Sequence, residues 1–155
     1  MSESQSLKVK LFADGADLAG IKEMAANPRI AGFTTNPTLM RKAGISDYKG
    51  FALQVLEAIG GRPLALEVFA DDFPTMEGQA LEIASWGKSI NVKIPVTNTK
   101  GEFCGPLVER LSKAGVQVNV TAVMTIEQVK RITACLAAQT PAIISVFAGL
   151  SLIHI

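Results

Sequence analysis

The 155-residue sequence has few of the residues that metal and disulfide sites require. It contains one histidine, His154, and two cysteines, Cys104 and Cys135, which stand far apart along the chain. A single histidine argues against a histidine-based metal centre and against serine–histidine catalysis. The cysteines lack the close spacing of a zinc site. We therefore expect no metal and two reduced thiols, as in cytoplasmic proteins.

Aromatic residues are also scarce, at 6% of the chain, and charge is balanced, with 15 basic and 14 acidic residues. A base-stacking platform for nucleic acid needs aromatic side chains among basic ones, and the sequence shows no such patch. No apolar run reaches about 18 residues, and the opening segment MSESQSLKVK lacks the apolar core of a signal peptide. We expect a cytoplasmic protein that binds neither nucleic acid nor a membrane.

Apolar residues are abundant, at 48% of the chain, and they form short runs that alternate with helical patterns. The runs predict β-strands at residues 8–14, 30–36, 63–70, 90–97, 116–124 and 142–149. Two of the helical patterns between them begin at good N-cap residues, Asp47 and Thr125. Strands that alternate with helices in this way pair in parallel through right-handed crossovers.

Two α/β architectures fit this order, an open doubly wound sheet and a closed (β/α)8 TIM barrel. The sequence has no Gly-x-Gly-x-x-Gly motif after its first strand and no Walker motif, which weighs against a nucleotide-binding open sheet. Each predicted strand has one apolar face and one face with polar groups, whereas an open sheet covered on both sides should be apolar on both. We therefore predict a closed barrel.

Polar residues lie mostly in the C-terminal halves of the predicted strands. They are Asp14, Asn36, Glu67, Lys93, Asn119, Thr121 and Ser145. In a barrel the polar face points inward, and the C-terminal strand ends form the floor of the active site. We therefore expect these side chains to converge on one cavity.

Lys93 stands inside an apolar strand, between Val92 and Ile94. Desolvation disfavours the charged form of an amine, and a neutral amine can attack a carbonyl carbon. The resulting iminium withdraws electrons from the neighbouring carbon, so that a carbon–carbon bond can be broken or made without a metal. The alternative is a lysine that extends to solvent at the strand end and pairs with Glu67. Polar residues of matching parity on the other strands favour the catalytic interpretation.

Asp14 and Glu67 are carboxylates on different strands, and they can divide the proton transfers that Schiff-base chemistry needs. Either can instead form a structural ion pair, and Asp14 can shape a turn or cap the next helix. Thr121 can hold a water molecule for Glu67, or be an ordinary β-branched strand residue. Two interpretations fit Asn36, Asn119 and Ser145. They can hydrogen-bond sugar hydroxyls, or they can satisfy one another as buried polar groups.

Four segments, LFAD, GFTTNPT, NVKIPVT and ISVFAG, follow one another between residues 8 and 149. In this order they resemble the transaldolase family, including its small fructose-6-phosphate aldolase-like members. The TTNP segment and the VKIP lysine strand together are quite specific. The resemblance implies an eight-stranded α/β barrel that acts on sugar phosphates as its small-molecule partners, without a cofactor.

The resemblance also implies roles for individual residues. Lys93 matches the Schiff-base lysine, and Asp14 matches the acid/base that handles the substrate hydroxyl during bond cleavage. Glu67 and Thr121 match the pair that positions a catalytic water. The residues that match positions near the dihydroxyacetone moiety are Thr34, Asn36, Asn119 and Ser145.

Two residues bear on the type of reaction. Phe147, at the substrate site, stands where transaldolases carry phenylalanine and the aldolase relatives carry tyrosine. Glu67 stands where the aldolases tend to have glutamine. Both favour transfer of a dihydroxyacetone unit from fructose 6-phosphate or sedoheptulose 7-phosphate to an aldose phosphate, in the pentose phosphate pathway. A fructose-6-phosphate aldolase, which is a lyase, and a catalytically inert fragment are the alternatives.

The sequence departs from the family pattern after residue 149. The family carries an arginine there that grips the substrate phosphate, whereas this chain has Leu150 followed by SLIHI. A complete barrel takes roughly 250 residues, so we expect the last two βα units to be missing. We predict a partial barrel over residues 1–149 and a non-family tail over 150–155. Exposed strand edges would then favour a homo-oligomer.

Overall fold

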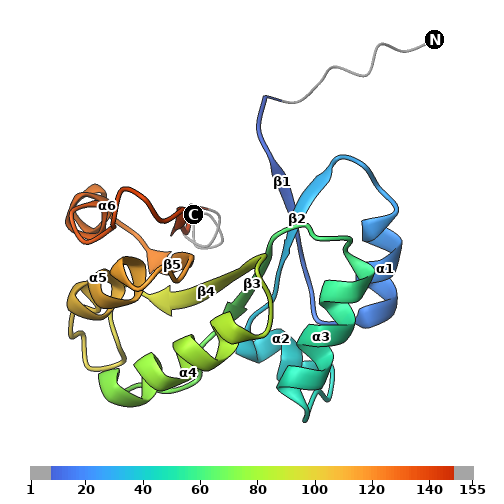
Figure 1. Ribbon diagram of the computed structural model, residues 1–155, viewed down its shortest axis with the longest axis horizontal. Coiled ribbons are helices and arrows are strands. Elements are labelled where there is room, and N and C mark those ends of the chain that lie inside the picture. The colour runs from blue at the N-terminus through green and yellow to red at the C-terminus, as the bar shows by residue number, and fades with distance from the viewer. Residues whose placement is uncertain (1–7, 149–155) are drawn as a thin grey trace, which may run out of the picture. The chain divides into compact units, whose positions relative to one another are not determined.

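The computed structural model describes residues 8–148, and the chain divides into two compact units, unit 1 (Met1–Leu64) and unit 2 (Ala65–Ile155). Figure 1 shows the order of the helices and strands along the chain. The predicted tail over 150–155 lies outside the described residues. The domain predicted over 1–149 therefore stays a prediction.

Unit 1 begins with strand β1 (Leu11–Asp14), helix α1 (Leu18–Ala25) and strand β2 (Ile30–Thr34), followed by helices α2 (Pro37–Lys42) and α3 (Tyr48–Ala58). The two strands pair in parallel, with Asp14 opposite Thr34. Helix α3 begins at the predicted N-cap, Asp47, whose carboxylate accepts the N–H of Gly50 at 2.8 Å. Helix α2 was not predicted. Asn36 caps it, and Pro37 supplies the first-turn φ that a helix requires.

In its described part, up to residue 148, unit 2 has three helices and the strands that they connect. After strand β3 (Leu64–Glu67), which starts at the unit boundary, the elements are α4 (Phe73–Ser85), β4 (Ile90–Pro95), α5 (Gly105–Lys113), β5 (Val118–Val123), α6 (Ile126–Thr133) and β6 (Ala142–Val146). Strand β4 pairs in parallel with β5, and β5 pairs in parallel with β6. Helix α6 begins at the predicted N-cap Thr125, which forms a capping box with Gln128.

Hydrogen-bonded strands follow chain order without a reversal inside unit 2. Each right-handed crossover therefore steps in the same direction and places its helix on the same face of the strands. Helices α4, α5 and α6 accordingly lie on one side of the strands of unit 2 (Figure 1). A doubly wound sheet reverses its order and carries helices on both faces. The arrangement in unit 2 is that of a segment of a (β/α) barrel.

The alternation predicted for β4 accounts for the core of unit 2. Val92 and Ile94 are fully buried on the side that faces the helices, and Val118 and Val120 of β5 join them. Burying each of these branched side chains stabilises the fold by up to about 1.5–3 kcal/mol. The opposite side of the same strands is also shielded from solvent, but it carries polar side chains. This polar side is where the candidate site lies.

Strand β5 contains a bulge. Val120 stands opposite Ile144 and Val123 opposite Val146, so β5 has one residue more than β6 between these pairs. Ala122 lies in the bulge with φ +57°, a value that no other non-glycine residue in 8–148 approaches. Because opposite residues share a face, the extra residue returns Val123 to the apolar face, where it is fully buried.

Candidate functional site

Lys93 and Glu67 form an ion pair on neighbouring strands. Nζ of Lys93 lies 3.0 Å from Oε2 of Glu67, and the two side chains are 9% and 19% exposed. The alternative that placed the Lys93 amine in solvent is therefore wrong, although its pairing with Glu67 is present. The two side chains are largely buried, and their amine and carboxylate are within hydrogen-bond distance, so a proton can pass between them.

A row of polar side chains continues from Lys93 onto the next two strands. Asn119 on β5 stands opposite Lys93 on β4, and side chains of opposite residues in a parallel pair point to the same face. The hydroxyl of Ser145 on β6 donates to Oδ1 of Asn119 at 2.7 Å. Asn119 is only 6% exposed, so this bond satisfies a buried amide oxygen.

Thr121 lies two residues beyond Asn119, on the same face and next to the bulge at Ala122. It stands opposite Pro95 and is 3% exposed. Phe147 follows β6, where its N–H donates to the carbonyl of Val123 at 2.9 Å, and its side chain is half-buried. Unit 2 thus aligns the candidate residues of four successive strands, namely Glu67, Lys93, Asn119, Thr121 and Ser145.

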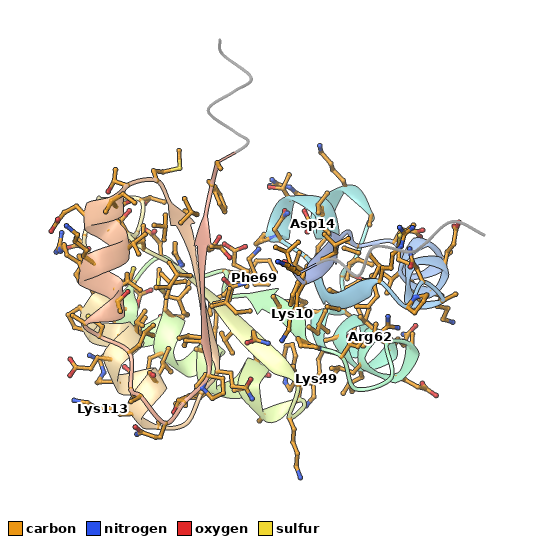
Figure 2. All side chains as sticks on the ribbon, turned by 90° about the horizontal axis from the view of Figure 1, so that it is seen from above. Lys10, Asp14, Lys49, Arg62, Phe69 and Lys113 are labelled. Carbon is orange, nitrogen blue, oxygen red and sulfur yellow. The ribbon has the colours of Figure 1, made fainter. Side chains whose placement is uncertain are left out.

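Unit 1 places its candidate residues at the C-terminal ends of β1 and β2. Asp14 (Figure 2) stands opposite Thr34, and the N–H of Gly15 donates to the Thr34 carbonyl at 3.0 Å. Asp14 also lines a cavity of about 240 Å³, together with Asp17 and the start of α1. The carboxylate that caps α1 is that of Asp17, which accepts the N–H of Gly20 at 2.7 Å. The alternative that Asp14 caps this helix is therefore wrong.

Asn36 has a structural function that the sequence analysis did not predict. Its Oδ1 accepts the N–H of Leu39 at 3.0 Å and so caps α2. This bond satisfies one of the helix's unpaired N–H groups. Its predicted contact with a sugar hydroxyl stays a prediction.

The loops after β3 and β4 are tied together by residues that the sequence analysis missed. The carboxylate of Asp71 accepts the N–H of Thr99 at 2.8 Å and its hydroxyl at 2.6 Å, and these bonds lower the pKa of Asp71. Asn98 accepts the N–H groups of Lys100 and Glu102 and donates to the Asp71 carbonyl. The segment NTKGE has turn composition, but composition does not indicate a partner distant in sequence.

Two negative findings concern residues 8–148. No group of three or more histidine, cysteine, aspartate or glutamate side chains in this range is arranged to hold a metal ion. No helix in the same range combines the length and apolar character needed to cross a bilayer.

Fold and geometry together define a (β/α)-barrel protein whose strands carry a largely buried lysine–carboxylate pair. Comparison of the sequence with known families then gives a specific assignment. The profile of the Transaldolase/Fructose-6-phosphate aldolase family matches residues 11–150, and the chain belongs to this family. The predicted family is thereby confirmed.

Individual relatives agree with this assignment. A probable transaldolase of Dehalococcoides mccartyi is 37% identical over 120 residues, which are 77% of this chain and 54% of that protein. A probable transaldolase of Rhodospirillum centenum is 32% identical over 142 residues, 91% of this chain and 57% of its own length. The chain spans about half the length of the curated relatives it matches.

A solved structure supports the fold. The dihydrodipicolinate synthase of Rhodopseudomonas palustris superimposes with a TM-score of 0.56 over 81% of this chain and 50% of that one, at 13% identity. Identity at this level is informative about the fold alone. Together with the strand order inside unit 2, it confirms the predicted incomplete (β/α)8 barrel.

Proposed function

We propose that this chain carries the Schiff-base chemistry of a transaldolase, with Lys93 as the nucleophile. The observation that supports the proposal most strongly is the Lys93 side chain, which is only 9% exposed and whose Nζ lies 3.0 Å from the Glu67 carboxylate. Family membership adds weight, because residues 11–150 match a family named for transaldolase and fructose-6-phosphate aldolase.

The first step is formation of the iminium. A proton passes from the Lys93 ammonium to Glu67 or to a water beside it, leaving a neutral amine. The nitrogen then attacks the ketose carbonyl carbon, whose oxygen takes a proton, and loss of water from this carbinolamine gives the iminium. Glu67, whose Oε2 lies 3.0 Å from the nitrogen, can return the proton to the departing hydroxyl.

The second step breaks the carbon–carbon bond. The bonding electrons flow into the iminium to give an enamine, and the adjacent hydroxyl loses its proton as the aldehyde leaves. Asp14 is proposed as the acceptor of that proton, by resemblance to the family. The enamine then attacks the acceptor aldehyde, and hydrolysis by a water held by Glu67 and Thr121 frees Lys93.

The proposed substrates are sugar phosphates. Thr34, Asn36, Asn119, Ser145 and Phe147 are proposed to line the dihydroxyacetone part of the ketose. Fructose 6-phosphate or sedoheptulose 7-phosphate would be the donor, and an aldose phosphate the acceptor. The reaction would belong to the pentose phosphate pathway in the cytoplasm. A homo-oligomer is proposed from the uncovered apolar surface at β6, where Val146 is 53% exposed.

Borohydride trapping tests the proposal directly. With fructose 6-phosphate present, borohydride reduces the iminium to a stable amine, and mass spectrometry should locate the added mass on Lys93. Lys93→Ala should show no adduct. Lys113→Ala, which removes an exposed lysine, should trap as wild type does. Absence of an adduct on the wild-type chain would favour the catalytically inert alternative.

Product analysis separates transferase from lyase. A transaldolase given fructose 6-phosphate alone should release almost no free dihydroxyacetone, and addition of erythrose 4-phosphate should start turnover. Accumulation of dihydroxyacetone without an acceptor would favour the fructose-6-phosphate aldolase alternative. Phe147→Tyr is the informative variant, because the family resemblance associates tyrosine at this position with the lyase.

A further inference from the structure

Gln79 of helix α4 holds the backbone that follows Glu67. Its Oε1 accepts two consecutive N–H groups, that of Phe69 at 2.8 Å and that of Ala70 at 2.9 Å. The preceding N–H, of Val68, donates to the carbonyl of Lys93 at 3.3 Å. The three N–H groups after Glu67 are thus fixed, one by the backbone of Lys93 and two by a single side-chain oxygen.

Gln79 is itself held firmly. Helix α4 begins at Asp72, whose carboxylate accepts the N–H of Thr75 at 3.0 Å, and the helix packs against β4. On either side of Gln79, Met76 and Ala80 are buried in that packing. An acceptor on such a support can fix a strand end, because the end cannot move without breaking two hydrogen bonds.

We propose that Gln79 is a positioning residue that holds the carboxylate of Glu67 against Lys93. Strand β3 ends at Glu67, so the direction of this side chain depends on the backbone that follows it. Without the Gln79 acceptor, two N–H groups lose their bonds and the strand end gains freedom. The effect of Gln79 on catalysis rests on the proposed function, but its effect on the ion pair does not.

Three substitutions separate the acceptor from other properties of the side chain. Gln79→Met removes the oxygen at nearly constant length. Gln79→Asn keeps the amide but is one carbon shorter, so it cannot reach both N–H groups. Gln79→Glu keeps an oxygen at the original reach, so it should rescue. Thermal unfolding of each variant shows whether it is folded at the assay temperature.

The chain offers a matched control in Gln128. Its Oε1 accepts the N–H groups of Met124 and Thr125 at 2.7 and 3.1 Å, so it fixes the loop after β5 as Gln79 fixes the loop after β3. Gln128→Met removes an equivalent pair of bonds at a distance from Glu67. Its effect should therefore be independent of Glu67.

The first measurement is the rate of borohydride trapping in a double-mutant cycle. Gln79→Met and Gln79→Asn should slow trapping roughly tenfold, because a small misplacement of a catalytic group is costly. Gln79→Glu should trap close to the wild-type rate. In a Glu67→Gln background Gln79→Met should cause no further loss, whereas Gln128→Met should have the same effect in both backgrounds.

The second measurement does not need the reaction. A water-soluble carbodiimide joins an amine to a carboxylate only when the two are in contact, and mass spectrometry can quantify the Lys93–Glu67 amide. We expect this crosslink in wild type and Gln79→Glu, and a loss of roughly tenfold in Gln79→Met and Gln79→Asn, in line with the trapping rate. Equal crosslinking in all four proteins would overturn the inference.

The two measurements fail in different ways. A wild-type chain that crosslinks but does not trap would refute the proposed function and leave the positioning inference standing, provided that Gln79→Met loses the crosslink. A wild type that traps, with Gln79→Met trapping equally fast, would leave the function standing and refute the inference. A wild type without the crosslink would refute the ion pair and the inference together.

Discussion

The Lys93 amine and the Glu67 carboxylate are 3.0 Å apart and belong to neighbouring strands. Both groups are largely removed from water, with side chains 9% and 19% exposed. Each charge has lost most of its hydration, so each depends on the other and on nearby polar groups for stabilisation.

Removal of Glu67 should therefore destabilise the fold. We expect Glu67→Leu to lower the free energy of unfolding by about 3 kcal/mol, because the Lys93 charge stays buried without its main partner. Lys93→Met combined with Glu67→Leu removes both charges and should recover most of the loss. Urea unfolding at pH 7 measures both variants. Wild-type stability in Glu67→Leu alone would contradict the prediction.

Arg62 joins three elements of unit 1 (Figure 2). Its guanidinium donates to the carbonyls of Ala25 at 2.8 Å, Ile30 at 3.1 Å and Ile59 at 2.8 Å. We expect Arg62→Met to cost about 3 kcal/mol, since these partly buried carbonyls lose a charged donor. Arg62→Lys should lower the free energy of unfolding by roughly half as much. The lysine ammonium keeps the positive charge but lacks the planar set of donors that reaches all three carbonyls.

Lys113 provides the control for Arg62 in the same denaturation experiment. It pairs with Glu109 at 2.6 Å on an exposed helix surface, and its side chain is 65% exposed. Lys113→Ala should change stability by no more than about 0.5 kcal/mol. If Arg62→Met were as mild as Lys113→Ala, the three-element role of Arg62 would be wrong.

The bulge residue Ala122 has φ +57°, in the left-handed region. This conformation is unfavourable for alanine by about 1–2 kcal/mol, whereas glycine adopts it without a steric cost. Glycine also loses more entropy on folding, by roughly 0.4–1 kcal/mol. We expect Ala122→Gly to stabilise by about 0.5 kcal/mol and Ala122→Val to destabilise, measured as shifts in the unfolding midpoint.

The same substitution elsewhere should have the opposite sign. Ala52 lies in helix α3 and is fully buried. Ala52→Gly should cost about 1 kcal/mol or more, because glycine is a poor helix former. Equal effects of Ala122→Gly and Ala52→Gly would show that the backbone at Ala122 is unstrained.

Cys104 should be the less reactive of the two cysteines. Burial raises the pKa of its thiol from 9.0 to about 11, with Asp71 and Glu102 adding to the effect. At pH 8 a disulfide-exchange reagent should therefore modify the half-buried Cys135 first, and Cys104 only on unfolding. Prompt modification of both thiols in the native protein would contradict this order.

The same shift predicts a pH dependence of stability. A folded-state pKa above the unfolded one means that the folded state holds its proton more tightly. The contribution of the protonated Cys104 thiol to the free energy of unfolding is fully present below about pH 9 and is lost as the pH rises towards 11. Cys104→Ala should flatten the plot of unfolding free energy against pH in this window and leave the shape of that plot near neutral pH unchanged. Denaturant unfolding at a series of pH values measures both.

Local interactions explain why much of the fold was predictable. The N-caps Asp47 and Thr125 bond to N–H groups three residues away, so their signal is contained in a few adjacent positions. The alternation in β4 likewise places Lys93 on the polar face without reference to any other strand. The family resemblance was also predictable, because it is carried by short segments of adjacent residues.

Other features depend on partners that a local pattern does not contain. The strand predicted over 30–36 ends at Thr34, because Asn36 caps α2 and Pro37 begins that helix. The strand predicted over 8–14 begins only at Leu11, the first residue that pairs with the neighbouring strand β2. The bulge at Ala122 has no sequence signal, since alanine is not a residue typical of the left-handed region.

The sequence alone determined that strands and helices alternate, which strand faces are apolar, and that Lys93 lies on a polar face. These properties follow from side-chain periodicity and short-range hydrogen bonds. The sequence offered a Lys93–Glu67 pair and bonds among Asn36, Asn119 and Ser145 only as alternatives. The tertiary structure decided that Glu67 meets the Lys93 amine and that Ser145 bonds Asn119, and it alone revealed Gln79 at the backbone after Glu67. Such contacts depend on strand register and helix packing, which join residues that no local pattern relates.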